Sequence, residues 1–172
     1  HLGEPAVASV AGDAGIPYAL STLGTTSIED LAAAAPATRR WFQLYVWRDR
    51  DASEALVRRA AAAGYDTLIL TVDTAVGGIR RRDVRNGLTI PPRLSARTLA
   101  QMAVRPRWWA NVLTTEPLEF ATLTSTGGTV GELLTRVLDG SMTMADVAWL
   151  RSLWRGALMV KGVQSVDDAC LL

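Results

Sequence analysis

Three short apolar segments recur about every 25 residues near the start of the chain, and this spacing limits the possible fold more than any other feature. They lie at Ile16–Leu20, Trp41–Val46 and Asp66–Val72. A fourth apolar segment, Ala157–Lys161, follows after a much longer gap. Each segment has the length and composition of a buried strand. The spacing leaves room for one helix after each of the first two strands, and such alternation favours an α/β fold with a parallel sheet covered by helices.

The segments between the strands carry helix signals. Thr26-x-x-Glu29 has the form of a capping box and predicts the start of one helix. Ser53 is expected to precede an alanine-rich helix that ends at Gly64. The pattern Ser165-x-x-Asp168 predicts the start of a last helix.

The third and fourth strands are separated by about 70 residues, far more than the two to six of an ordinary connection. We expect a long insertion at about residues 75–145. It includes the pair Trp108-Trp109, and its last part, Thr143–Trp154, has the apolar spacing of a helix. Loops of this length are often lids or binding segments.

Bulk composition excludes several classes of protein. The net charge of +1 gives no overall attraction to nucleic acid. No apolar run approaches the roughly 20 residues that span a bilayer. The single cysteine, Cys170, excludes an internal disulfide framework and suits a reducing cytoplasm. The hydrophobic content of 49% allows a substantial core.

Polar side chains gather at the ends of the predicted strands. Thr71 and Asp73 are two residues apart and so share a face, as do Gln43 and Tyr45. Lys161 closes the fourth strand. From the pattern alone, Gln43 and Tyr45 are either a satisfied buried pair or a functional pair. Lys161 either faces an anionic partner or extends into solvent from the strand end.

Five motifs, in order along the whole chain, resemble the family of FMN-dependent 2-hydroxy-acid dehydrogenases and oxidases. The central one runs from the strand end TVDT through RRRDVRNG to IPP. The others are HLGE at the start, PYALSTLGTTSIED at 17–30, WFQLYVWRDR at 41–50 and MVKGV at 159–163. Through LSTLGTTSIED, LEFATLTSTGGTVGELL and RPRWW, the chain most resembles the actinobacterial L-lactate dehydrogenase branch of this family.

The resemblance implies a partial (β/α)₈ barrel in which the four strands are the second to the fifth, with the long insertion after the family's fourth strand. Such a barrel typically needs about 250 residues. We therefore expect residues 1–172 to be one incomplete FMN-dependent hydroxy-acid dehydrogenase domain. The alternative is a complete small α/β domain.

The resemblance also implies how FMN is held. Gln43 would contact the pyrimidine edge of the flavin, with Ser21 and Thr71 as further hydrogen-bonding partners. Lys161 would lie near flavin N1 and stabilise the negative charge of the reduced ring. No metal is implied.

Catalytic and substrate roles follow by the same resemblance. Tyr45 and Arg80 would hold the substrate carboxylate, since a guanidinium can donate two parallel hydrogen bonds. Leu23 would line the pocket for the substrate side chain. Asp73 would support the catalytic histidine and stabilise its protonated form. The remaining arginines of this stretch, Arg81, Arg82 and Arg85, are expected to be solvated or paired with Asp83.

The family's catalytic histidine belongs to a His-Gly-Gly-Arg motif that this chain does not contain. The single histidine, His1, belongs to the HLGE motif and is not that base. The implied activity of the full-length parent is oxidation of an L-2-hydroxy acid, L-lactate to pyruvate, and we expect the 172 residues alone to be inactive. Alternatives are lactate 2-monooxygenase, a general 2-hydroxy-acid oxidase or a peptide-modifying flavoprotein. A different class is a non-catalytic flavin-binding or interaction remnant.

The implied partners are a small 2-hydroxy acid and an electron acceptor, which could be a quinone, a cytochrome or oxygen. The full-length protein is expected to form a homo-oligomer, a tetramer. We expect a cytoplasmic location. The tryptophan-rich segment is either a lid or a peripheral contact with the inner face of the membrane, or it packs over the barrel or forms an oligomer interface, and the pattern favours the packing role.

Overall fold

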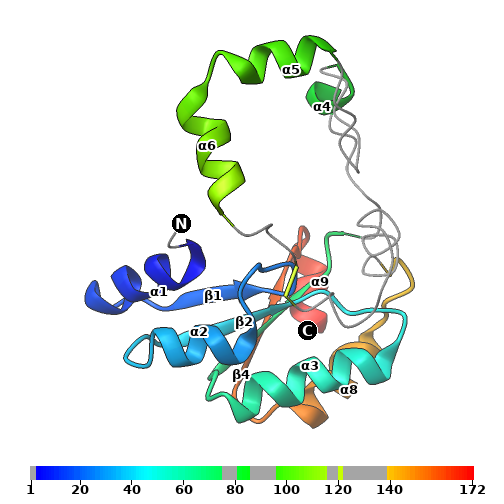
Figure 1. The fold of residues 1–172 in the computed structure, drawn as a ribbon. Coiled ribbons are helices and arrows are strands. Elements are labelled where there is room, and N and C mark those ends of the chain that lie inside the picture. Colours follow the sequence, from blue (N-terminus) through cyan, green and yellow to red (C-terminus); the bar gives the residue numbers. More distant parts are fainter. Residues whose placement is uncertain (1–2, 75–80, 86–95, 116–119, 122–138) are drawn as a thin grey trace.

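The computed structural model describes residues 3–74, 81–85, 96–115, 120–121 and 139–172 (Figure 1). The strands are β1 (Tyr18–Ser21), β2 (Arg40–Leu44), β3 (Thr67–Thr71) and β4 (Ala157–Lys161). The helices in the described ranges are α1 (Gly3–Asp13), α2 (Ile28–Ala34), α3 (Arg50–Ala62), α4 (Arg81–Arg85), α5 (Ala96–Ala103), α6 (Pro106–Thr114), α8 (Met144–Leu153) and α9 (Val166–Leu171).

The four strands form one parallel sheet in the order β1-β2-β3-β4, as the repeat spacing predicted. The register pairs Ser21 with Gln43, Gln43 with Ile69, and Thr71 with Lys161. Because the strands are parallel and adjacent, their carboxyl ends meet along one edge of the sheet. The predicted α/β class and the adjacency of the four strands are confirmed.

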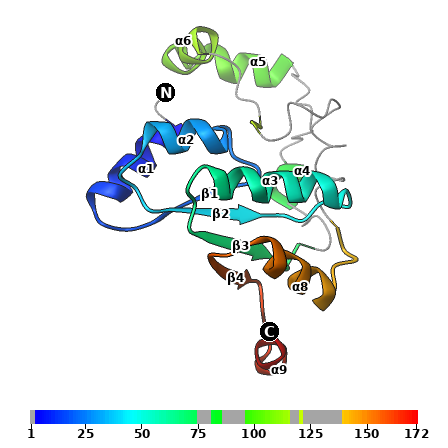
Figure 2. The same ribbon diagram turned by 90° about the horizontal axis from the view of Figure 1, so that it is seen from below.

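The core lies between one face of the sheet and the row of helices α1, α2, α3 and α8 (Figure 2). Alternate strand residues point toward these helices, among them the fully buried Leu20, Phe42 and Leu68. The other alternate residues, including Gln43, face the opposite side. This division leaves polar groups at the strand ends free of the main core.

Two predicted helix starts need correction. The helix α2 is capped by Ser27, whose hydroxyl accepts a hydrogen bond from the Asp30 backbone N–H at 3.0 Å, and not by Thr26. The helix α3 begins before Ser53, with Asp49 as its cap. Ser53 is buried in the first turn, where its hydroxyl accepts from the Trp47 N–H at 2.9 Å. The predicted end at Gly64 is confirmed, with a left-handed φ of +78°.

The two remaining predicted helices agree with the structure. Ser165 caps α9 by accepting from the Asp168 N–H at 3.0 Å. Thr143 precedes α8, and the Asp146 carboxylate accepts from its backbone N–H at 2.8 Å. The helix predicted at Thr143–Trp154 is therefore present as α8.

The described part of the long insertion contains α5 and α6, which lie apart from the sheet (Figure 1). Both carry exposed apolar side chains, including Leu99, Trp108 and Trp109. In the described ranges no helix is long and apolar enough to cross a membrane.

Candidate functional site

A row of hydrogen bonds links three of the predicted site residues across the carboxyl ends of β1, β2 and β3. The Ser21 hydroxyl donates to Gln43 Oε1 at 2.8 Å, and Gln43 Nε2 donates to Thr71 Oγ1 at 2.8 Å. Thr71 is buried, whereas Ser21 and Gln43 are half-buried. The sequence pattern predicted that these polar side chains gather at the strand ends, and the structure brings them together.

The Gln43 amide keeps capacity for a further partner. A primary amide has two N–H donors, and Thr71 takes one of them. Gln43 is fixed from both sides by Ser21 and Thr71, so its orientation is set before any ligand binds. A half-buried, oriented amide donor of this kind suits recognition of a planar polar edge.

Lys161 and Asp73 form an ion pair at the ends of β4 and β3. Lys161 Nζ lies 3.1 Å from Asp73 Oδ2 and 3.3 Å from Oδ1. The two side chains are 55% and 31% exposed, so the pair is accessible to a third group. Lys161 has an anionic partner, one of the two outcomes that the sequence left open.

Gly162 lets β4 approach Asp73 closely. A Cβ at this position would lie 2.6 Å from the Asp73 Cβ and 2.8 Å from its backbone nitrogen. The φ of Gly162 is +108°, a value that side chains of L residues rarely adopt. Glycine is therefore required here both for its backbone angle and for space.

Tyr45 and Leu23 lie next to this row. Tyr45 shares a small cleft with Thr71, Asp139 and Met142. Leu23 is half-buried, and its backbone N–H donates to the Ser21 hydroxyl at 3.1 Å. Both residues are thus at the same edge of the sheet as the hydrogen-bonded row.

The arginine stretch is only partly described. Arg80 lies outside the described residues, so its predicted contact with a carboxylate stays a prediction. Arg81, Arg82 and Arg85 are on α4 and are exposed, which agrees with the expected solvation.

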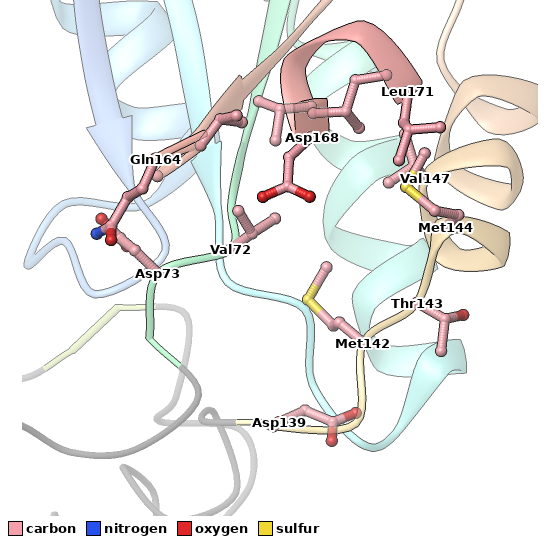
Figure 3. Close-up of a pocket in the computed structure, with 15 residues that line it drawn as sticks. Val72, Asp73, Asp139, Met142, Thr143, Met144, Val147, Gln164, Asp168 and Leu171 are labelled. Atoms are coloured by element: carbon pink, nitrogen blue, oxygen red, sulfur yellow. The ribbon is translucent and has the colours of Figure 1, made fainter. Parts of the chain in front are cut away.

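A cavity of about 640 Å³ lies beyond Asp73, between the ends of β3 and β4 and the helices α8 and α9. Figure 3 shows Val72, Met142 and Asp168 directed toward its middle. Asp139 and Met142 line both this cavity and the small cleft beside Tyr45. No group of three potential metal ligands occurs among the described residues.

Sequence reasoning missed an ion cluster beside the site. Arg50 Nη1 lies 2.9 Å from Asp139 Oδ2, and Arg50 Nη2 lies 2.9 Å from Asp146 Oδ1. Hydrogen bonds from the Ser141 hydroxyl and backbone N–H, followed by the Arg50 guanidinium, hold the pKa of Asp139 below its usual range. No local pattern could have revealed these pairs, because they join residues 89 and 96 positions apart.

Glu4 was also missed, although it belongs to the HLGE motif. Its carboxylate accepts from the Thr25 backbone N–H and from the Thr25 hydroxyl, both at 3.0 Å. Burial raises the pKa of Glu4, but hydrogen bonds from Thr26 and Thr25 outweigh this and lower it. Glu4 thereby fixes the loop after β1, which carries Leu23.

Comparison with known proteins identifies the family. The FMN-dependent dehydrogenase family matches residues 1–172, the full length of the chain. The chain belongs to this family. Its members are FMN-dependent by the family's own description, and the sequence resemblance is confirmed.

Relatives agree with this assignment. A Mycobacterium tuberculosis protein, named provisionally as an L-lactate dehydrogenase, is 59% identical over 97% of the chain and 40% of its own length. (S)-Mandelate dehydrogenase of Pseudomonas putida is 39% identical over 97% of the chain and 43% of its own length. The chain thus spans less than half of these relatives.

Solved structures support the same fold. A structure described as the monotopic membrane protein (S)-mandelate dehydrogenase superposes with a TM-score of 0.88 at 37% identity. It covers 97% of this chain, which in turn covers 45% of that structure. The predicted partial barrel of a flavoenzyme is confirmed by this likeness.

The residues at the sheet edge fit an FMN group. Gln43 offers a fixed amide donor, Ser21 and Thr71 offer hydroxyls, and Lys161 offers a cation within reach of the same edge. This set combines hydrogen-bonding groups for a pyrimidine ring with a positive charge for its electron-rich side.

Proposed function

We propose that the protein carrying this sequence oxidises an L-2-hydroxy acid, L-lactate to pyruvate, with FMN as its cofactor. The observation that carries the proposal is the fixed row Ser21–Gln43–Thr71 with the Lys161 ammonium group at the same sheet edge. The 59% identity to the mycobacterial relative supports L-lactate as the substrate.

Each residue has a proposed task. FMN, when bound, accepts the two electrons of the oxidation, and Ser21, Gln43, Thr71 and Lys161 hold it. Tyr45 and Arg80 bind the substrate carboxylate, and Leu23 lines the space for its side chain. Asp73 supports the histidine that removes a proton from the substrate, a residue that this chain does not include.

Anaerobic mixing of the full-length, FMN-loaded protein with substrate tests the activity. L-lactate should bleach the visible absorbance of the oxidised flavin, because the flavin takes up the two electrons of the oxidation, and pyruvate should appear in an amount equal to that of FMN. D-lactate serves as the control. Bleaching by L-mandelate but not L-lactate would contradict the proposed substrate, and bleaching by neither would contradict the proposed function.

A non-catalytic flavin-binding remnant is the alternative of another class. The gene sequence beyond Leu172 separates the two most simply. An open frame that contains a His-Gly-Gly-Arg motif favours the enzyme, and a stop codon favours the remnant. Lactate 2-monooxygenase would take up oxygen with L-lactate and form acetate. A general 2-hydroxy-acid oxidase would take up oxygen with a wider range of substrates.

We also propose that residues 1–172 are part of one domain of a cytoplasmic homotetramer that contacts the inner face of the membrane peripherally. The exposed Trp108 and Trp109 on α6, next to the exposed Arg105 and Arg107, suit an interface with anionic lipid. The likeness to a monotopic membrane protein supports the membrane contact. The electron acceptor could then be a membrane quinone, with a cytochrome or oxygen as the alternatives.

A further inference from the structure

The ion cluster of Arg50, Asp139 and Asp146 joins two segments that are far apart in the sequence and that both line the small cleft beside Tyr45 or adjoin it. Arg50 is the first residue of α3, just after the strand that leads to Tyr45. Asp139 and Asp146 lie where the long insertion returns to the barrel. Arg50 Nε also donates to Asp146 Oδ1 at 2.9 Å, so the guanidinium binds both carboxylates.

The cluster is more than a surface ion pair. The Asp139 side chain is 4% exposed and that of Asp146 is 16% exposed. The comparable pair on α3, Arg58 with Glu54, is 69% and 30% exposed. Surface pairs contribute little to structure, whereas desolvated, hydrogen-bonded pairs fix their partners strongly.

Arg50 also contacts the segment that follows Tyr45 in the chain. Arg50 Nη1 also donates to the backbone carbonyl of Trp47, which lies two residues after Tyr45. The Trp47 N–H in turn donates to Ser53 at 2.9 Å. One guanidinium therefore holds both the loop that carries Tyr45 and the segment that carries Met142.

Both segments meet at the small cleft beside the hydrogen-bonded row Ser21–Gln43–Thr71. Tyr45, Asp139 and Met142 line this cleft together with Thr71. Asp139 cannot swing into the cleft freely, because its Oδ1 accepts from the Ser141 hydroxyl at 2.6 Å and from the Ser141 N–H at 3.0 Å. The position of Tyr45 relative to Met142 thus depends on the cluster.

We propose that Arg50 and Asp139 are positioning residues that set Tyr45 against Met142 and so determine how tightly the hydroxy-acid substrate binds. This inference rests on the proposed function, because it takes Tyr45 as a ligand of the substrate carboxylate. Neither side chain needs to touch the substrate. Displacement of Tyr45 would weaken substrate binding in ground state and transition state alike, which raises KM and leaves kcat nearly unchanged.

The test compares Arg50→Lys and Asp139→Asn with wild type in the full-length, FMN-loaded protein, using L-lactate. Lysine keeps the charge but cannot bind two carboxylates and a carbonyl with one planar group. We expect KM to rise about tenfold or more, since misplacement of a binding group by about 1 Å can cost up to 10²-fold. FMN content and kcat per bound FMN should stay within about threefold of wild type.

Arg58→Lys is the matched control, because it changes the same residue type in the same helix and should leave KM unaltered. A purely structural role would lower FMN content or the active fraction and leave KM unchanged, and that result would overturn the inference. An equal rise of KM in Arg58→Lys would also overturn it. If Arg50→Lys and Asp139→Asn fail to fold, Ser141→Ala provides the milder test, because it removes only one hydrogen bond to Asp139. A smaller increase of KM is expected, and an unchanged KM would overturn the inference.

Wild-type measurements separate this inference from the proposed function. If wild-type protein does not respond to L-lactate or another 2-hydroxy acid, the proposed function fails and the inference fails with it. If wild type is active and the variants keep its KM, the inference alone is wrong.

Discussion

Lys161 and Asp73 pair with each other, although their proposed tasks concern a flavin and a histidine. Their 3.1 Å contact places the cation and the carboxylate side by side at the sheet edge. The two charges attract each other, and water solvates both side chains because they are 55% and 31% exposed. Both can therefore be kept at the site without a bound ligand.

Replacement of Lys161 by Met should slow flavin reduction in the full-length enzyme by about 10²–10³, the usual effect of losing one electrostatic partner of the transition state. Met keeps the length and apolar stem of lysine, so the packing of β4 should survive. Asp73 is 31% exposed and stays hydrated after the change. Stopped-flow reduction at saturating L-lactate measures the rate on folded, FMN-loaded protein. A rate within a few-fold of wild type would remove Lys161 from the mechanism.

Gly162→Ala should destabilise the protein more than Gly15→Ala does. Both glycines have positive φ, +108° and +70°, and each substitution should cost about 1–3 kcal/mol in backbone strain. At Gly15 an added Cβ meets nothing within 4 Å, whereas at Gly162 it lies 2.6 Å from the Asp73 Cβ. The excess loss at Gly162 should be at least about 1 kcal/mol, as expected for overpacking. Urea unfolding of both variants measures it, and equal losses would contradict the steric argument.

At the scale of elements, ion pairs with Arg50 hold the segment that carries Asp139 and Asp146. The free energy of unfolding should therefore depend on pH. The pKa of Asp139 is lowered in the folded protein, mainly by Ser141 and then by Arg50. Its stabilising contribution is therefore complete above the unfolded value of roughly 3.9 and is lost as pH falls through the lower folded value.

Asp139→Asn should consequently remove part of the acid sensitivity. The difference in urea midpoint between wild type and Asp139→Asn should be constant from about pH 7 to pH 5 and shrink below about pH 4. Other carboxylates titrate in both proteins and cancel in this difference. A difference in urea midpoint that stays constant down to pH 3, roughly one unit below the pKa of Asp in the unfolded chain, would contradict the stabilising role of the Asp139 carboxylate.

The helix α6 presents Trp108 at 48% and Trp109 at 40% exposure. We expect Trp108→Ser/Trp109→Ser to reduce co-sedimentation of the full-length protein with anionic liposomes several-fold, because amphipathic aromatic segments bind at the lipid interface. Val7→Ser/Val10→Ser is the control, since it removes two exposed apolar side chains from α1. Equal partition of the tryptophan variant and wild type would favour an oligomer interface instead.

At the scale of the whole molecule, the chain contains one histidine, His1, which belongs to the HLGE motif, and no His-Gly-Gly-Arg motif. The 172-residue polypeptide alone should therefore not oxidise L-lactate even when supplied with FMN, because it lacks the motif to which the catalytic histidine of the family belongs. Pyruvate formation measured against the full-length protein tests this. Turnover by the 172 residues would show that another group serves as the base.

The fold was largely predictable because its signals are local. Strand-length apolar segments and caps such as Ser165 depend on neighbouring residues, and they were located to within a few positions. The shift of one cap from Thr26 to Ser27 reflects two adjacent hydroxyl residues that local pattern cannot distinguish. The gathering of Gln43 and Thr71 at one edge was predictable because neighbouring parallel strands end together, although their hydrogen bond was not predicted.

The rest of the site could not be predicted because it depends on contacts between distant segments. The Arg50–Asp139 pair spans 89 positions, and no periodicity encodes which arginine meets which aspartate. The pattern left open whether Lys161 faces an anion or solvent, and its pairing with Asp73 depends on the close approach at Gly162. The helix α1 was not anticipated either, although Glu4 within it fixes the loop after β1.

The order of strands in the sheet is also the order in which a ribosome makes them. The strands β1, β2 and β3 can pair as soon as they emerge, but some 85 residues separate Thr71 from Ala157. At 5–20 residues per second, synthesis of that stretch takes about 4–17 s. During those seconds the nascent chain presents the apolar edge of β3 without its partner, which is an opportunity for chaperone binding or for mispairing with a neighbouring nascent chain. The long insertion thus delays the completion of the sheet, and slower translation of it would lengthen the time during which β3 lacks its partner strand.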